Sequence, residues 1–546
     1  MLDATTTVPL PVNEPVRSYV PGSAERASLE AKVKEMAGEQ VDLTMTIAGK
    51  QRPGSGAAIE VVQPHRHSAV LGTLHEAGAA DVQAAVDAAL AAAPAWRATS
   101  YDDRAAVLLR AAELLSGPWR DTLNAATMLG QSKSCYQAEI DSACELIDFL
   151  RFNVAFGAQV LAEQPVSSPG VWNRLDHRPL EGFVLAITPF NFTAIAANLP
   201  LAPALMGNTV VWKPSPTQQL AAHWTMRLLE AAGLPPGVVN LVTGNGQAVS
   251  EVALPHPALA GIHFTGSTQT FQALWQRVGQ GLSTYNTYPR MVGETGGKDF
   301  VLAHPSADPL ALEVALVRGA FEYQGQKCSA ASRAYVPPSL REAGLRDGLA
   351  DRARSLAYGD VTDLSVFGGA VIDRRAYDRL SGVVRAAAGD PALEVLAGGG
   401  ADDSEGFFVD PTVLVGSDPA HEVFVQEYFG PVLAVHVWDD SAPGAWDDVL
   451  RLVDTTAPYA LTGAVFARDA YAATQATEAL RFTAGNYYLN DKPTGAVVGQ
   501  QPFGGARASG TNDKAGSVLN LLRWTSPRTL KETLSPALDH RYPHMG

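Results

Sequence analysis

Cysteine is the side chain best suited to nucleophilic catalysis in this chain, and only three cysteines occur among its 546 residues. Cys328 follows a glycine at position 325 and is flanked by Lys327 and by the hydroxyl of Ser329. Because a free thiol has a pKa of about 8.5, only a small fraction is thiolate at neutral pH, and an adjacent cation raises that fraction. A lone cysteine is more often a small buried apolar residue, but two other segments favour a catalytic Cys328.

Both of these segments present a polar side chain just beyond an apolar strand. Glu294 follows an apolar pair and precedes Thr295 and two glycines. A carboxylate on such a flexible turn is suited to act as a general base. Asn191 lies beyond an apolar strand that ends at Pro189, and its carboxamide can donate a hydrogen bond to a developing oxyanion. Taken separately, Glu294 and Asn191 are equally well explained as ordinary turn residues.

Six short motifs follow one another along the chain: Phe-Asn-Phe, Trp-Lys-Pro-Ser, Phe-Thr-Gly-Ser, Glu-Thr-Gly-Gly-Lys, Gly-Gln-Lys-Cys and Glu-Tyr-Phe-Gly-Pro. This ordered set resembles the aldehyde dehydrogenase superfamily. Within it, the chain resembles the 1-pyrroline-5-carboxylate dehydrogenases, also called glutamate-γ-semialdehyde dehydrogenases, through residues 499–514, 13–16 and 523–527. The resemblance therefore extends over almost the whole chain.

The resemblance implies a role for each of the three candidate residues. Cys328 would attack an aldehyde carbon as thiolate, Asn191 and the Cys328 backbone N–H would stabilise the oxyanion, and Glu294 would activate the water that hydrolyses the thioester. The implied reaction is NAD-dependent oxidation of L-glutamate γ-semialdehyde to L-glutamate, the second step of proline catabolism. Two alternatives stay open: a dehydrogenase for another small aldehyde such as succinate semialdehyde, and a non-catalytic binding or structural protein that retains the fold.

The resemblance also implies where NAD would bind. Lys213 matches the position at the adenosine ribose, Glu427 the position at the nicotinamide ribose, and Phe429 the border of the nicotinamide. Taken alone, Lys213 is better explained as a solvated charge at a strand end, and Phe429 as a core residue. Phe271 stands where many family members have glycine, and Pro216 stands where many NAD-using members have an acid, so NADP is an open alternative. The remaining cofactor positions are Ser215, Thr265, Gly266 and Ser267.

An aldehyde with an α-amino acid head brings a carboxylate and a short aliphatic chain into the site. Backbone N–H groups of the turn at residues 494–496 and a neighbouring hydroxyl suit the carboxylate, and two phenylalanines suit the aliphatic chain because they exclude water. Two charged residues match family positions at this pocket, although a surface charge would explain each equally well. The predicted substrate residues are therefore Ser329, Gly495, Ala496, Phe192 and Phe503, with Lys327 and Glu145 as the charged pair. No metal site is predicted.

The elements that must position these residues alternate along the chain. From residue 182 onward, apolar runs of about five residues alternate with helical segments, which predicts parallel βαβ units that bind a dinucleotide beyond the carboxyl ends of their strands. The predicted strands are residues 183–187, 209–212, 238–242 and 261–264, with helices that begin near residues 193, 217, 248 and 268. A second α/β unit has predicted strands near residues 300–302, 334–336, 432–437 and 461–466.

The predicted fold class is α/β, and the resemblance implies an aldehyde dehydrogenase-like fold with a Rossmann-type cofactor domain, an α/β catalytic domain and a β-hairpin oligomerisation element. We assign the NAD-binding domain to residues 1–157 and 179–290, and the catalytic domain to residues 291–489. The oligomerisation element takes residues 158–178, which periodicity alone predicts to be a loop, and 516–546. Residues 490–515 form a substrate-anchoring segment. Before residue 157, the chain predicts an irregular arm at 1–25, strands at 43–47 and 59–62, and helices at 24–36, 80–96, 102–115 and 136–156.

Composition narrows the classes of partner. The formal net charge of −15 argues against nucleic acid and anionic membranes. Residues 182–212 carry no charged side chain, but prolines and asparagines divide them into pieces too short for a membrane span. Three cysteines give no disulfide framework, and the first sixteen residues show no secretory or mitochondrial leader, so a cytoplasmic location is expected. The expected partners are a small-molecule substrate, further copies of the chain in a homodimer or an assembly of dimers, and a separate proline dehydrogenase.

Overall fold

A seven-stranded sheet in the N-terminal half carries several of the predicted site residues at its strand ends. The computed structural model describes residues 5–546, so the first four residues of the predicted arm, and of the segment searched for a leader, lie outside it. The strand order is β11-β10-β7-β8-β9-β2-β3, and the strands from β11 to β9 are parallel. The bounds are β2 Met45–Ile47, β3 Lys50–Arg52, β7 Phe183–Thr188, β8 Thr209–Pro214, β9 Val239–Leu241, β10 Leu259–Thr265 and β11 Arg290–Glu294.

Helices cover both faces of this first sheet. Alternate side chains of β7 point to opposite faces, as a period of two requires: Val184 and Ala186 pack with α3, α6, α7 and α8, whereas Phe183 and Leu185 pack with α2, α9 and α10. This two-sided burial explains the nearly uninterrupted apolar runs in the sequence. The predicted βαβ pattern is confirmed here. The helices are α2 Ala79–Ala98, α3 Tyr101–Ser116, α6 Leu146–Ala162, α7 Thr193–Leu205, α8 Gln219–Ala231, α9 Gly246–Ala253 and α10 Thr268–Gln280.

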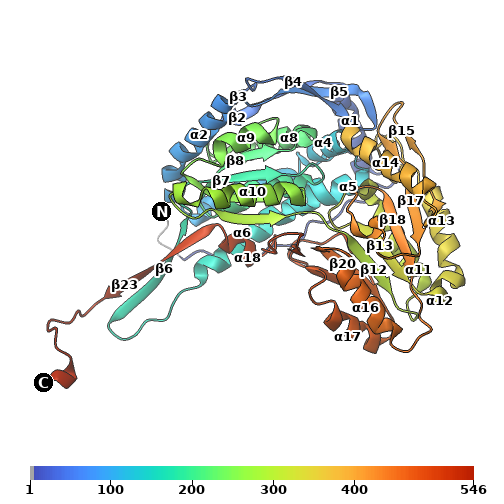
Figure 1. Ribbon diagram of the computed structural model, residues 1–546. Helices are drawn as coiled ribbons and strands as arrows, with labels where there is room; N and C mark the ends of the chain where they lie inside the picture. Colours follow the sequence, from blue (N-terminus) through green and yellow to red (C-terminus); the bar gives the residue numbers. More distant parts are fainter. Residues whose placement is uncertain (1–4) are drawn as a thin grey trace.

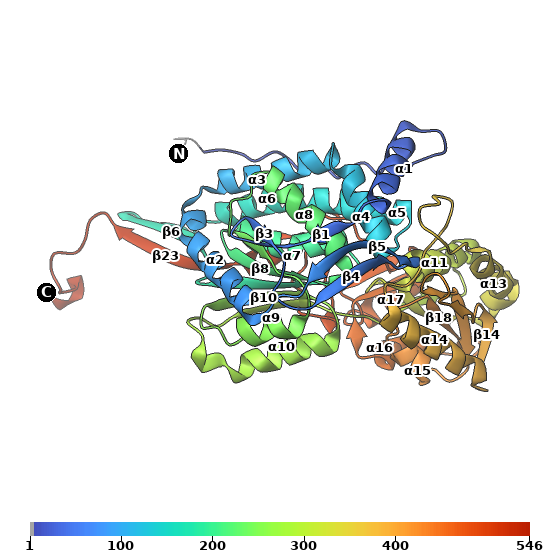
Figure 2. The same ribbon diagram turned by 90° about the horizontal axis from the view of Figure 1, so that it is seen from above.

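A second seven-stranded sheet forms the other lobe, beside the first in both views (Figure 1, Figure 2). Its order is β14-β17-β18-β13-β12-β20-β21, with only β14 antiparallel to its neighbour. The predicted α/β class is therefore confirmed. The strands are β12 Asp299–Ala303, β13 Ala331–Val336, β14 Leu393–Ala397, β17 Thr412–Gly416, β18 Val432–Val437, β20 Thr462–Phe466 and β21 Asn486–Leu489, and the covering helices are α11 Pro309–Phe321, α13 Arg346–Ser355, α14 Arg374–Gly389, α16 Ala445–Thr456 and α17 Ala470–Ala479.

The N-terminal region differs in detail from its prediction. The strand expected at residues 43–47 is two strands, β1 Val41–Leu43 and β2, which join different sheets. β1 pairs with β5 Arg66–His75, which also pairs with β4 Ala58–Gln63. The long helix expected at residues 136–156 is interrupted by a π-helical segment, Glu139–Glu145, between α5 Cys135–Ala138 and α6. The other helices here are α1 Ala24–Ala37 and α4 Arg120–Gln131.

A two-stranded ribbon projects from the first lobe, away from the second (Figure 1, Figure 2). It consists of β6 Val171–Pro179 and β23 Thr525–Thr533, paired antiparallel over nine residues. Periodicity predicted a loop at β6 because this strand has no buried face: its side chains are polar or partly exposed throughout. Among the described residues, 5–546, no helix is long and apolar enough to cross a membrane.

Candidate active site

Cys328 lies between α11 and β13, on a turn with unusual backbone geometry. Tyr323 and Gln324 have φ angles of 51° and 53°, and Gly325 follows at 64°. Left-handed conformations are costly for residues with side chains, so the surrounding structure must hold them. The side-chain amide of buried Gln324 does so by donating to the backbone carbonyls of Ser132, at 2.9 Å, and of residue 370, at 2.7 Å. Cys328, the predicted nucleophile, therefore follows a turn that is held in place by hydrogen bonds to other segments of the chain.

Asn191 reaches this turn from the first sheet, three residues after the end of β7. Its side chain is buried, and Nδ2 donates to the backbone carbonyl of Gln326 at 2.9 Å. A carboxamide has two N–H donors, so this bond leaves one for a further acceptor. The structure thus brings Asn191 to within two residues of Cys328 along the catalytic turn.

A buried ion pair, which the sequence analysis did not predict, holds the backbone just after Asn191. Lys133 Nζ lies 2.6 Å from Asp141 Oδ2. The same carboxylate accepts from the backbone N–H groups of Thr193 and Ala194, both at 3.0 Å, and so caps the start of α7. Lys133 Nζ is also 4.2 Å from the ring centre of Phe192. The signal available in the sequence was limited to a lysine and an aspartate eight residues apart in a largely polar stretch.

Glu294 ends β11, and the chain then crosses to the second lobe past the nucleophile. Its Oε2 accepts from the Gly505 backbone N–H at 2.7 Å, which seats the side chain on the 504–512 segment. Burial raises the pKa of Glu294 well above its usual range. At Gly297 the chain passes so close to Cys328 that an added Cβ would lie 2.8 Å from the Cys328 carbonyl oxygen. Glu294 and Cys328 therefore belong to one site, with Glu294 held at its edge.

A cavity of about 290 Å³ opens at Cys328. Lys298, Glu427 and Phe429 line it together with the half-buried thiol. Burial, and then the acidic groups around it, raise the pKa of the Cys328 thiol, so it needs a base before it can react. Burial raises the pKa of Glu427 to about 7, although this carboxylate accepts from the Gly297 N–H at 2.9 Å.

Lys298 and its neighbour Asp299 are further residues that the sequence analysis left without a role. Burial lowers the pKa of Lys298 to about 7. Burial raises the pKa of Asp299 well above its usual value, and one of its carboxylate oxygens, Oδ2, has no partner in the described chain, residues 5–546. Both residues directly follow the Glu-Thr-Gly-Gly motif, so their position beside the site could have been read from the sequence.

Five of the seven residues predicted to bind the cofactor lie at the carboxyl ends of β8 and β10, the two strands that flank β7. Lys213 is buried near the end of β8, and a Cβ on Gly246, which opens α9, would lie 3.6 Å from its Nζ. Burial lowers the pKa of Lys213 to about 8, and within residues 5–546 no acidic side chain opposes this. Thr265 ends β10, and Ser267 caps α10 by accepting from the Thr270 N–H. Gly266 lies between these two, and Ser215 follows β8 directly.

Phe271 fills the space that a glycine would leave open. Its ring stacks on Phe264 with centres 5.4 Å apart. A Cβ on Gly293 would lie 2.2 Å from the Phe271 ring, so this strand residue and the aromatic side chain fit only because glycine is present. Phe271, which stands in place of the family's glycine, therefore packs α10 against β11 next to Glu294.

The predicted substrate residues fall into two groups. Near the nucleophile, Ser329 Oγ lies 2.8 Å from Thr494 Oγ1, which joins the catalytic loop to the turn that contains Gly495 and Ala496. Phe192, Lys327 and Glu145 surround Lys133, and burial, followed by the charge of Asp141, raises the pKa of Glu145 well above its usual value. Phe503 belongs to the other group and directly precedes Gly504 and Gly505, which contact the Glu294 carboxylate.

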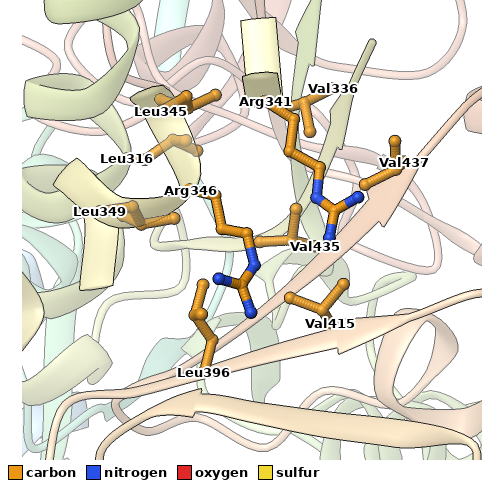
Figure 3. A pocket seen from close by; sticks show the side chains of 10 residues that line it. All are labelled: Leu316, Val336, Arg341, Leu345, Arg346, Leu349, Leu396, Val415, Val435 and Val437. Atoms are coloured by element: carbon orange, nitrogen blue, oxygen red, sulfur yellow. The ribbon is translucent and has the colours of Figure 1, made fainter. Parts of the chain in front are cut away.

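A larger hollow of about 350 Å³ lies away from Cys328 (Figure 3). Aliphatic side chains from α11, α13 and the second sheet form its wall, and two arginines, Arg341 and Arg346, extend across it. None of the predicted site residues lines it, so size alone does not identify the chemical site.

Comparison with known proteins agrees with this geometry. The model of the aldehyde dehydrogenase family matches residues 51–530. The chain belongs to the aldehyde dehydrogenase family. The structure of the Delta-pyrroline-5-carboxylate dehydrogenase from Mycobacterium tuberculosis bound with NAD is 61% identical, has a TM-score of 0.96 and is covered fully, as is this chain. The probable delta-1-pyrroline-5-carboxylate dehydrogenase of Schizosaccharomyces pombe is 49% identical over 97% of both chains. The resemblance inferred from the motifs is therefore confirmed.

The names of other relatives contradict the cytoplasmic location expected from the sequence. The human relative, 44% identical over 98% of this chain and 94% of its own length, is named a mitochondrial delta-1-pyrroline-5-carboxylate dehydrogenase. The relatives from Bos taurus and Emericella nidulans are also named mitochondrial. The cytoplasmic prediction is therefore wrong by this comparison, because it depended only on cysteine content and on the appearance of sixteen N-terminal residues.

Proposed function

We propose that this aldehyde dehydrogenase oxidises L-glutamate γ-semialdehyde, the open form of 1-pyrroline-5-carboxylate, to L-glutamate with NAD as the hydride acceptor. This is the second step of proline catabolism. The observation that carries the proposal is the meeting of Asn191, the segment from Glu294 to Gly297 and Cys328 around one catalytic turn. Relatives similar over nearly their whole length are named for this substrate.

In the proposed chemistry, the Cys328 thiol gives its proton to solvent and the sulfur then forms a bond to the aldehyde carbon, whose carbonyl π electrons move to the oxygen. The free N–H of Asn191 and the Cys328 backbone N–H stabilise the oxyanion that develops on the former carbonyl oxygen. After oxidation, the thioester carbonyl is attacked by water. Glu294 leaves its hydrogen bond with the Gly505 N–H and takes a proton from that water; the C–S bond then breaks, which releases the acid product and restores Cys328 as thiolate.

The residues at the strand ends fit a dinucleotide. Buried Lys213 supplies a cation without an acidic partner in the described chain, which suits the hydroxyls and phosphates of such a ligand. Lys213 and Ser215 would hold the adenosine ribose, Glu427 the nicotinamide ribose, and Phe429 would border the nicotinamide. The strand-end turn formed by Thr265, Gly266 and Ser267 would face the pyrophosphate. NAD held by these residues would supply the hydride acceptor for this oxidation.

The substrate head would be held beside Ser329. The turn at Gly495 and Ala496 would bind the carboxylate, Phe192 and Phe503 would enclose the aliphatic chain, and Lys327 with Glu145 would add charge at the same pocket.

The assembly is a further part of the proposal. The ribbon of β6 and β23 projects from the body with open edges, and such edges favour pairing with another chain, so we propose a homodimer or an assembly of dimers built through it. A separate proline dehydrogenase would supply the semialdehyde, since the aldehyde dehydrogenase family model already accounts for residues 51–530.

A substrate panel with NAD and NADP in parallel tests the function. We expect NADH formation with L-glutamate γ-semialdehyde at a kcat/KM well above that for succinate semialdehyde or propanal. Equal turnover of the simpler aldehydes would favour a dehydrogenase for another small aldehyde. A purified protein that binds neither NAD nor any aldehyde would favour a non-catalytic protein.

A further inference from the structure

The turn at residues 494–496 is built around a lysine to which no role has been given above. Lys492 Nζ donates to the Thr494 carbonyl at 2.8 Å. Gly495 has a φ of +95°, and a Cβ there would lie 2.7 Å from the same Nζ. The backbone therefore wraps closely around the ammonium group, and this close approach requires glycine at 495.

Glu322 connects this ammonium to the catalytic loop. Its Oε2 lies 3.0 Å from Lys327 Nζ and 3.9 Å from Lys492 Nζ. Burial raises the pKa of Glu322, but the two lysines outweigh burial and bring that pKa below its usual value, so the group is a carboxylate. Glu322 also begins the left-handed turn that leads to Cys328. One anion thus joins the residue before the nucleophile to the turn at residues 494–496.

Two packing contacts strengthen the same connection. Ser329 and Thr494 are joined through their hydroxyls. Gly319 of α11 faces the start of the segment so closely that an added Cβ would lie 3.5 Å from Pro493 Cδ and 3.6 Å from Lys492 Cβ. The catalytic loop and the turn at residues 494–496 therefore form one packed unit.

The charges of this unit are unequal. Lys327, Lys492 and Arg318 bring three positive charges, whereas Glu322 and Asp491 bring two negative charges, which leaves one positive charge beside the backbone N–H groups of the turn. A positive charge next to free N–H donors complements a carboxylate.

We propose that Lys492 is a specificity-determining positioning residue: held by Glu322, it shapes the turn at residues 494–496 and sets where a substrate carboxylate lies relative to Cys328. The inference rests on the proposed function, since it concerns the amino acid head of that substrate. An aldehyde without a carboxylate has no group for this turn. Lys492 therefore selects among aldehydes and takes no part in the chemical step.

Three full-length variants test this role. Lys492→Met keeps the aliphatic length but removes the ammonium, Lys492→Arg keeps the charge, and Lys50→Met removes an exposed lysine of β3 as a matched control. For each, kcat and KM are measured with L-glutamate γ-semialdehyde and with propanal at saturating NAD. Binding of L-glutamate and of NAD is measured by calorimetry.

For Lys492→Met we expect the ratio of kcat/KM for the semialdehyde to that for propanal to fall by about tenfold or more, mainly through KM, since a lost hydrogen bond to a charged group has about that weight. L-glutamate should bind correspondingly more weakly, whereas NAD should bind as in the wild type, which shows that the variant is folded. Lys492→Arg should recover part of the ratio, and Lys50→Met should leave it unchanged.

An unchanged ratio, or an equal loss for both aldehydes, would overturn the inference and make Lys492 merely structural. These results leave the proposed function intact if the wild type prefers the semialdehyde. A wild type that prefers propanal would overturn the proposed function and the inference with it.

Discussion

Replacing Asp141 by leucine should destabilise the protein far more than replacing Lys133 by methionine, although the two side chains form one buried ion pair. Without Asp141, the ammonium of fully buried Lys133 loses its ion-pair partner and keeps the ring faces of Phe192 and Tyr323, at 4.2 and 4.5 Å, with Glu145 as a more distant carboxylate. Leaving a buried charge unpaired costs about 3–5 kcal/mol. Without Lys133, the Asp141 carboxylate keeps the backbone N–H groups of Thr193 and Ala194. The loss is then nearer that of one charged hydrogen bond, about 1.5–3 kcal/mol.

The Asp141→Leu variant should also show a characteristic pH dependence. Burial already lowers the pKa of Lys133, and Asp141 opposes that effect, so its removal lowers this pKa further. Between the lowered folded pKa and the unfolded value of about 10.4, the unfolded chain binds more protons than the folded one, so the stability of the variant rises with pH.

Urea denaturation, followed by tryptophan fluorescence, measures the free energy of unfolding and its dependence on pH. The first unfolding transition is compared among the two single variants and the double variant Lys133→Met/Asp141→Leu. The double variant should be more stable than Asp141→Leu alone, because no unpaired ammonium remains buried. Equal losses in the single variants, additive losses in the double variant, or a pH-independent Asp141→Leu deficit would refute this reasoning.

Three further predictions concern the chemistry. Cys328→Ala should abolish NADH formation while calorimetry still detects NAD binding, because the thiol forms the covalent bond and the cofactor residues stay in place. Asn191→Ala should lower kcat by about 10²–10³, the cost of one oxyanion donor, in steady-state assays; a change below about threefold would remove Asn191 from that role. Because the ionised form of Glu294 is the base and its pKa is raised by burial, the hydrolytic rate should fall as pH falls through that raised pKa, and Glu294→Gln should give an NADH burst followed by slow turnover.

The sequence predicted the parts of the fold that follow from short-range patterns. The apolar runs of β7 and β8 are buried on both faces, so their composition alone identifies strands of a covered parallel sheet. β6 was predicted to be a loop because a strand without a buried face shows no alternation of apolar and polar residues. The π-helical segment Glu139–Glu145 was not predicted for another reason: it contains Asp141, which contacts the start of α7 more than fifty residues away.

The site likewise contains residues that short-range patterns predict and residues that only long-range contacts explain. Cys328, Glu294 and Asn191 could be proposed from residue type, from the turns on which they lie, and from the motifs that resemble the aldehyde dehydrogenase superfamily. The ion pair of Lys133 with Asp141 and the carboxylate of Glu322 between two lysines could not, since their roles depend on which loops the fold brings together. Phe271 shows the limit of motif comparison, because its size is explained only by Gly293 on the neighbouring strand.

The ribbon can fold only late during synthesis of the chain. Pro179 and Thr525 are paired neighbours that lie 346 residues apart, so β6 leaves the ribosome long before its partner strand exists. At translation rates of about 5–20 residues per second, this delay lasts roughly 17 to 70 s. The charged side chains of Arg174, Asp176 and Arg178 along β6 discourage association with other nascent chains during that interval. The newly made protein thus completes its projecting arm only after β23 has been translated.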